Sequence, residues 1–161
     1  MIPNFIEVKY ALWPLLPPGI WDANMEEVSD RFAINEHRRK LFEGLQNGVT
    51  NIFQAGSPYI YLDGSYVTAK PLPNDFEVCW EMSFVDPVIL DPVFLVFENG
   101  RLAQKQKYLG EFFPATVTEG QTGKPFLDFF QTDKQSGASK GIVRIFNNIN
   151  NDRYDNKRQT I

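Results

Sequence analysis

The chain has almost none of the two side chains that form most metal and nucleophile sites in proteins. Among its 161 residues there is one cysteine, Cys79, and one histidine, His37. These counts exclude a disulfide framework or a cysteine-rich zinc site within one chain, and they leave little basis for His-based metal clusters or Ser-His-Asp catalysis. Carboxylates would therefore hold any metal, which favours hard ions such as Mg²⁺ or Mn²⁺.

Long apolar runs and an excess of basic charge are also missing. No run approaches the roughly 18 apolar residues of a membrane span. Prolines between Pro3 and Pro18 interrupt the apolar stretch that a signal peptide would need. We therefore expect a soluble, cytoplasmic protein without a membrane partner. The 16 basic and 20 acidic residues give a net charge of -4, so non-specific binding to nucleic-acid backbones is not expected.

What the chain does have is apolar material for one folded domain. Hydrophobic residues make up 43% of it, including fourteen phenylalanines. The composition changes twice along the chain. Residues 1–22 are apolar and proline-rich and predict an extended arm, 23–146 predict the folded domain, and 147–161 predict a polar tail.

The periodicity of apolar residues predicts helices early in the domain. Asn24 can cap a short helix over about 25–32, and Asn35 can cap a longer one. In the longer helix the apolar positions recur at helical spacing: Leu41, Leu45, Val49, Ile52 and Phe53. We expect His37 and the basic run Arg38, Arg39 and Lys40 on the solvated surface at the start of this helix.

Short β-type runs follow, mixed with further helices. Strands are expected at 59–62, 76–80, 112–117 and 141–146. Helices are expected after Asp91-Pro92 and at about 100–108, and the run 126–131 fits either a helix or a strand. In the second strand, Cys79 is expected as a small buried hydrophobe.

The segment with the clearest chemistry is YLDGSYVTAKPLPNDFEVCWE, residues 61–81. A strand ends at Gly64-Ser65, nine residues (66–74) follow, and Asp75 and Glu77 enter the next strand. A Gly-Ser turn lets backbone N–H groups and a hydroxyl approach phosphate oxygens. Two carboxylates at positions i and i+2 of a strand point the same way, so both can bind divalent ions. An ordinary turn and a solvated strand face would also produce this pattern.

Nearby polar residues are candidates for phosphate contacts. Thr68 and Lys70 lie in the connection between the two strands, although a surface lysine in a loop is common. Lys134, Lys140 and Arg144 flank a Gly- and Ser-bearing stretch and can help to bind an anion, and a simple turn explains them about as well.

The pattern of Gly64-Ser65 followed by Asp75-x-Glu77 resembles the nucleotidyltransferase superfamily. The wider chain, from about Leu16 to Ile145, is similar to a bacterial family of short nucleotidyltransferase-like proteins, through LPPGIW, NEHRRKLFEGL, DGSYVTAKPLPNDFEVCW and FLDFFQTDKQSGASKGIVRI. The resemblance implies a mixed α/β (α+β) fold with a mixed β-sheet flanked by helices. It also implies Mg²⁺ or Mn²⁺ dependence, with an NTP, ATP first among them, as the donor.

The resemblance implies roles for individual residues. Gly64, Ser65, Thr68 and Lys70 would bind the nucleotide, and Asp75 and Glu77 would bind metal, with Glu77 standing where the superfamily more often has Asp. The usual third carboxylate is not identified by a motif. We assign it to Asp128, because an acid inside the apolar run PFLDFF needs a reason to be there. Glu111 and Glu119 are the rivals.

Two functions follow from this resemblance. In the first, the domain transfers an NMP to a hydroxyl of a protein, RNA or small molecule, as minimal nucleotidyltransferases do in toxin–antitoxin or phage-defence systems. In the second, catalysis is lost and the domain acts as a regulatory or antitoxin-like binding module. The sequence leaves the oligomeric state open.

Overall fold

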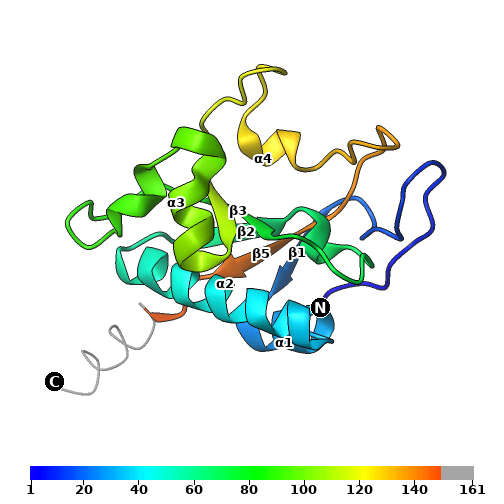
Figure 1. Cartoon of the computed structure of the whole chain (residues 1–161), viewed down its shortest axis with the longest axis horizontal. Helices are drawn as coiled ribbons and strands as arrows, with labels where there is room; N and C mark the ends of the chain where they lie inside the picture. The colour runs from blue at the N-terminus through cyan, green and yellow to red at the C-terminus, as the bar shows by residue number, and fades with distance from the viewer. Residues whose placement is uncertain (150–161) are drawn as a thin grey trace, which may run out of the picture.

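A five-stranded mixed sheet forms the centre of the structure, a computed structural model that describes residues 1–149 (Figure 1). The strands are β1 (Ile20–Ala23), β2 (Tyr59–Asp63), β3 (Phe76–Trp80), β4 (Gly110–Pro114) and β5 (Ile142–Phe146). Their order is β1-β5-β2-β3-β4, with β1–β5 and β3–β4 parallel and the two central pairs antiparallel. The predicted mixed α/β class is confirmed. Within residues 1–149, no helix is long and apolar enough to cross a membrane.

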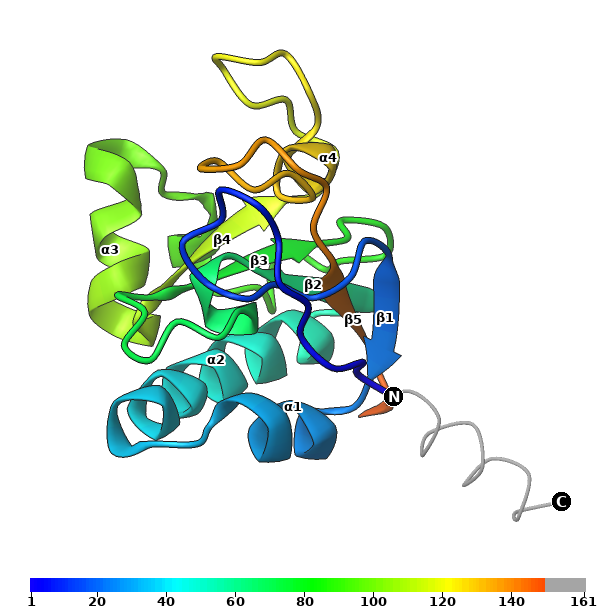
Figure 2. The same ribbon diagram turned by 90° about the vertical axis from the view of Figure 1, so that its right-hand side faces the viewer.

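Helices cover both faces of this sheet. They are α1 (Met25–Phe32), α2 (Glu36–Gln54), α3 (Glu98–Tyr108) and α4 (Phe126–Phe129), with short 3₁₀ turns at Ser65–Val67 and Pro92–Leu95. Figure 2 shows α1 and α2 together on one side, α4 on the opposite side, and α3 beside β4. One face of the sheet is therefore covered by α1 and α2, and the other is covered by α4 and the loops around it.

The first two helices begin where the sequence predicts. The side chains of Asn24 and Asn35 accept hydrogen bonds from the backbone N–H groups of Glu27 and Arg38. The apolar positions predicted for α2 are all buried. The expectation that Arg38 lies on the solvated surface is wrong, because its side chain is 1% exposed. Its neighbours Arg39 and Lys40 are exposed, as is His37.

Alternation along the strands assigns side chains to the two faces. Phe76, Val78 and Trp80 of β3 join the main core beneath α1 and α2. Cys79 of β3 lies on the other face, buried against Tyr61 and Phe113 in a second, smaller core. Glu77, two residues before Cys79, points to that same second face.

Several predicted boundaries shift. The predicted arm 1–22 ends in a strand, because β1 pairs with β5 at the edge of the sheet and an ion pair between Asp22 and Arg144 (2.7 Å) joins them. The strand expected at 112–117 occupies Gly110–Pro114, and the run 126–131 contains a helix. Of the predicted tail 147–161, residues 150–161 lie outside the described part.

Candidate functional site

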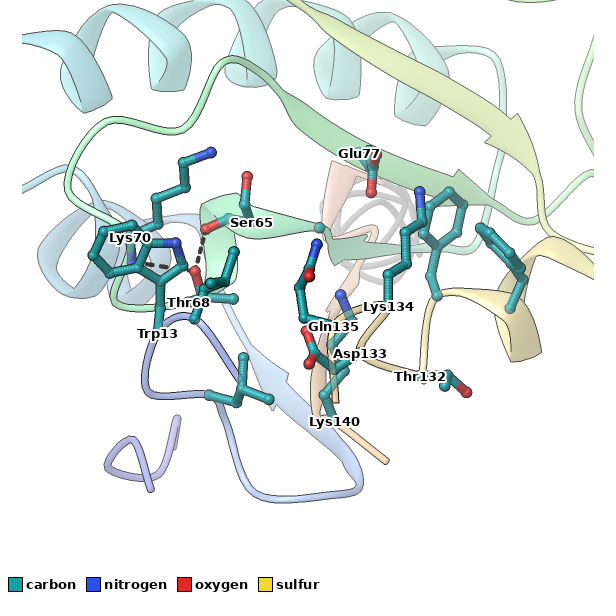
Figure 3. A pocket seen from close by; sticks show the side chains of 15 residues that line it. Trp13, Ser65, Thr68, Lys70, Glu77, Thr132, Asp133, Lys134, Gln135 and Lys140 are labelled. Atoms are coloured by element: carbon teal, nitrogen blue, oxygen red, sulfur yellow. Dashed lines mark hydrogen bonds between the residues drawn. The ribbon is translucent and has the colours of Figure 1, made fainter. Parts of the chain in front are cut away.

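A pocket of about 230 Å³ opens in front of the turn that follows β2, on the sheet face opposite α2 (Figure 3). Four separate segments of the chain supply its walls: the N-terminal arm, the turn after β2, strand β3 and the stretch from α4 to β5. The lining residues are Leu12, Trp13, Leu15, Gly64, Ser65, Thr68, Lys70, Glu77, Phe129, Phe130, Thr132, Asp133, Lys134, Gln135 and Lys140. Five of the residues predicted from the sequence are therefore brought to one site: Gly64, Ser65, Thr68, Lys70 and Glu77.

The turn at Gly64 is in direct contact with Glu77. Gly64 has φ 78° and ψ -166°, a conformation that is essentially restricted to glycine. A Cβ at this position would lie 2.5 Å from Oε2 of Glu77. The contact follows from the strand register, which pairs Asp63 directly with Glu77. The absence of a side chain at Gly64 is thus what allows the Glu77 carboxyl to approach the turn.

A buried arginine holds the rest of the turn in place. The guanidinium of Arg38 donates to the carbonyl oxygens of Tyr66 (2.8 Å), Thr68 (2.9 Å) and Lys70 in the turn, and of Phe32 (3.2 Å) at the end of α1. The bonds to Phe32, Tyr66 and Thr68 are buried, where a carbonyl oxygen without a partner is costly. Arg38 therefore fixes the position of the Ser65–Lys70 backbone relative to α2.

The hydroxyl of Thr68 also has a structural use. It donates to the carbonyl oxygen of Ser65 (2.7 Å) and accepts from the backbone N–H of Lys70 (3.2 Å), so it closes the turn that it belongs to. Thr68 lines the pocket, as predicted, but these two bonds occupy its hydroxyl. Its contribution to ligand binding would come chiefly from shaping the turn.

Acidic side chains occur at the same level on three neighbouring strands. The register pairs Asp63 of β2 with Glu77 of β3, and Glu77 with Glu111 of β4. Asp75 lies just before β3. Burial, together with the charge of Asp75, raises the pKa of Glu77 to about 7, and burial and the charge of Glu111 raise the pKa of Asp75. The row concentrates negative charge beside the pocket.

Asp63 is the most unusual member of this row. It is fully buried, and neither of its carboxylate oxygens has a hydrogen-bond partner among residues 1–149. Burial and the neighbouring Glu77 carboxyl raise its pKa well above the ordinary value. This shift favours the protonated form of Asp63, which reduces the repulsion between it and the Glu77 carboxyl.

Three lysines bring positive charge to the pocket. Lys70 comes from the turn after β2, and Lys134 and Lys140 come from the stretch between α4 and β5. That stretch is folded back on itself: Asp133 accepts hydrogen bonds from the backbone N–H (2.8 Å) and hydroxyl of Ser136. Lys134 and Lys140 therefore lie in a loop that is held by internal hydrogen bonds. Arg144, the other cation considered from the sequence, pairs with Asp22 and does not line the pocket.

The predicted third carboxylate, Asp128, is not among the residues that line the pocket. It is an exposed residue of α4, whose apolar contacts come from Phe126 and Phe130. The acid in the apolar run is therefore explained by helical geometry, and it needs no metal. Of its two rivals, Glu111 is the cross-strand neighbour of Glu77, whereas Glu119 accepts hydrogen bonds from Thr122 in a loop.

The acids fit a hard divalent cation by their chemistry, but they are not gathered into a complete site. In the described part of the chain, no three His, Cys, Asp or Glu side chains are grouped as metal ligands. Glu111 forms an ion pair with Lys105 (2.7 Å). Glu77 and Asp75 supply oxygen donors of the type that Mg²⁺ binds, and phosphate oxygens and water would complete the coordination.

Sequence reasoning missed the contributions from the N-terminal arm and from Thr132, Asp133 and Gln135. These residues lie far in sequence from the turn after β2. No local pattern indicates that the arm crosses the pocket, although the aromatic content of residues 1–22 is a weak sign that it packs on the domain.

Comparison with known proteins gives a family and no function. No curated protein matches the chain, and no solved structure does. A family model described as "Family of unknown function (DUF6932)" matches residues 10–146, which include the arm from Tyr10, the turn after β2, the acidic row and all three lysines. The chain belongs to this family.

Proposed function

We propose that this domain is a metal-dependent nucleotidyltransferase, which transfers an NMP from an NTP to a hydroxyl of a protein, an RNA or a small molecule. The pocket has two chemically different parts that such a reaction needs. One is a cationic and hydroxyl-bearing wall, formed by Lys70, Lys134, Lys140 and Ser65, which suits the phosphates. The other is the carboxyl group of Glu77, which suits a divalent cation; Asp75, two residues earlier in the chain, does not line the pocket and would add a second carboxylate from beside it.

The observation that supports the proposal most directly is the contact between Gly64 and Glu77. Phosphate binding at a Gly-Ser turn and metal binding at a carboxylate are often separate functions in proteins. Here the Glu77 carboxyl occupies the space where a Cβ of residue 64 would stand, and both residues line one pocket. A phosphate group on the turn would lie beside the acid, which is the arrangement that a cation-bridged phosphate requires.

The reaction balances with groups that the site contains. The oxygen of the acceptor hydroxyl forms a bond to the α-phosphorus, and the bond from that phosphorus to the bridging oxygen breaks. Pyrophosphate leaves with the electron pair, and the hydroxyl proton passes to a carboxylate of the Asp75 and Glu77 pair. The lysines reduce the negative charge that develops on the leaving pyrophosphate.

Asp75 and Glu77 are the residues that would hold Mg²⁺ or Mn²⁺, with Glu111 as the nearest further acid on the sheet. Such an ion, when bound, neutralises phosphate charge and lowers the pKa of a coordinated hydroxyl. Binding would also favour the ionised form of Glu77, whose pKa is about 7 without an ion.

The proposal is tested by label transfer. The protein is incubated with Mg²⁺, a cell lysate and ATP labelled in either the α- or the γ-phosphate. We expect label from the α-phosphate alone to become attached to an acceptor, because the γ-phosphate leaves in pyrophosphate. Asp75→Asn and Glu77→Gln should each lower the rate by about 100-fold or more.

Asp128→Asn is the matched control, because it removes an acid of the same kind at an exposed position. It should retain nearly full activity. Transfer of γ-label would indicate a phosphotransferase, and transfer that survives both Asp75→Asn and Glu77→Gln would place the chemistry elsewhere.

One observation favours a second candidate, a nucleotide-binding module without catalysis. Glu111, the best-placed third acid, is engaged by Lys105 at 2.7 Å, and no group of three acids is assembled within residues 1–149. A binding module would bind ATP in calorimetry and yield no labelled product with any NTP or lysate.

A further inference from the structure

The N-terminal arm contributes a wall to the pocket and is hydrogen-bonded to the turn after β2, which forms another wall. The carbonyl oxygen of Pro14 accepts a hydrogen bond from the backbone N–H of Ala69 (3.0 Å), in the turn after β2. Ile6 and Leu15 exchange two backbone hydrogen bonds of 2.8 and 3.0 Å, so the arm folds back on itself. These contacts fix the segment that contains Trp13.

Trp13 leaves a large aromatic surface uncovered. Leu15, two residues later, is 3% exposed and belongs to the buried core, whereas Trp13 is 39% exposed and lines the pocket. Figure 3 shows its ring on the side of Ser65 and Thr68, well separated from Lys134 and Lys140 across the pocket. Trp13 and Lys70 thus lie at one end of the pocket, and Lys134 and Lys140 lie at the other.

We infer that Trp13 is the stacking surface for the nucleobase of the donor, so that the substrate class is a nucleotide and not an inorganic polyphosphate. The inference rests on the proposed function, which it extends from the phosphates to the base. Planar bases stack on indole rings, while lysines at a distance bind phosphate oxygens. Because every base has a π-face, stacking alone gives little base preference.

The two other aromatic rings at the pocket are less suited to this role. Phe130 is 4% exposed and packs in the second core. Phe129 lies on the α4 side, and the ammonium group of Lys134 lies 5.4 Å from the centre of its ring. A triphosphate bound by Lys134 and Lys140 would bring its charged end to that ring. Trp13 is the aromatic group at the end away from Lys134 and Lys140.

The test compares two ligands that differ in the base and ribose. Binding of ATP and of inorganic tripolyphosphate, each with Mg²⁺, is measured by calorimetry. We expect the wild type to bind ATP more tightly. Trp13→Ala should weaken ATP binding about ten-fold, within the range for loss of one base-stacking contact, and should leave tripolyphosphate binding unchanged. Trp13→Phe should restore most of the ATP affinity.

Tyr10→Ala is the matched control, because Tyr10 is an exposed aromatic residue of the same arm outside the pocket lining. It should affect neither ligand. Equal weakening of both ligands by Trp13→Ala would mean that Trp13 only supports the pocket, and loss of ATP binding in Phe129→Leu but not in Trp13→Ala would place the base on the opposite side. Either result overturns the inference and leaves the proposed function standing, whereas a wild type that binds neither ligand overturns both.

Discussion

Gly64 is the residue on which the geometry of the pocket depends most closely. Two independent constraints act at this position: a backbone conformation that L-residues rarely adopt, and a carboxylate that occupies the space of a Cβ. Gly123 also has a positive φ, 71°, but a Cβ there would meet nothing within 4 Å. Gly123→Ala therefore reports the cost of a positive φ at a position without a steric contact.

We predict that Gly64→Ala lowers the free energy of unfolding by roughly 3 kcal/mol or more, since strain and the Glu77 contact add, whereas Gly123→Ala costs about 1 kcal/mol. Denaturant unfolding measures both. In a Glu77→Ala background, the cost of Gly64→Ala should fall by about 1–2 kcal/mol, because the clash is gone and the strain remains. An unchanged cost in that background would mean that Gly64 and Glu77 are not in contact.

At the scale of elements, the turn after β2 is held by α2 through one side chain. Arg38 has no carboxylate partner in the structure described here and is satisfied by backbone carbonyl oxygens and by the ring of Tyr66, 5.0 Å from its guanidinium carbon. Burial lowers the pKa of Arg38 from its usual value, although the group stays charged. Loss of the Arg38 side chain is therefore expected to free the turn after β2 from helix α2.

We predict that Arg38→Met destabilises the domain by roughly 3–5 kcal/mol, because at least three buried carbonyl oxygens lose a charged donor. Arg39→Met, on the exposed side of the same helix, should change the free energy of unfolding by less than about 0.5 kcal/mol. Denaturant unfolding of the two variants gives the comparison. Equal effects would contradict the role assigned to Arg38.

The elements that could be predicted from the sequence are those with local signals. Residues close together in the sequence indicate the helix caps at Asn24 and Asn35 and the apolar spacing of α2. The same is true of the two strands β2 and β3. Strand β1 was not predicted, because its pairing with β5 joins residues more than a hundred positions apart. Arg38 was placed in solvent because its partners, the carbonyls of a distant turn, have no side-chain signature.

The same distinction applies to the candidate site. The resemblance to a known pattern links Gly64-Ser65 with Asp75 and Glu77, and the antiparallel register of β2 and β3 places Gly64 beside Glu77. Trp13 and the loop with Lys134 are distant in sequence from the turn after β2, so the spacing of residues in the sequence does not predict that they line the same pocket. Asp128 was chosen on an apolar context that a short helix explains better.

The whole molecule has one sheet face that is purely apolar and one that is not. On the first, α1 and α2 cover a continuous core. On the second, a small aromatic core adjoins the row Asp63, Glu77 and Glu111. Placing ionisable groups there opposes folding whenever they are charged, because a buried carboxylate loses its hydration. The stability of the entire domain should therefore depend on pH.

The sign of this dependence follows from Glu77. Its pKa is 4.5 in the unfolded chain and about 7 in the folded one, so between these values the folded state binds more protons. The contribution of Glu77 to the free energy of unfolding is therefore fully present below pH 4.5, and this contribution is lost as the pH rises through 7. Asp63, whose pKa is also raised, acts in the same direction.

We predict that the wild-type free energy of unfolding falls by about 2–3 kcal/mol between pH 5 and pH 8, at about 1.4 kcal/mol per pKa unit. Glu77→Gln should flatten this profile and be more stable than the wild type at pH 8, while Glu43→Gln, at an exposed position of α2, should follow the wild type. Denaturant unfolding across this range measures all three.

Saturating Mg²⁺ at pH 8 should recover part of the lost free energy of unfolding in the wild type and none in Glu77→Gln, because an ion bound to the folded state offsets the same buried charge. A wild-type profile that rises from pH 5 to pH 8 would show that Glu77 is ionised at little cost, and the acidic row would then be an ordinary solvated surface.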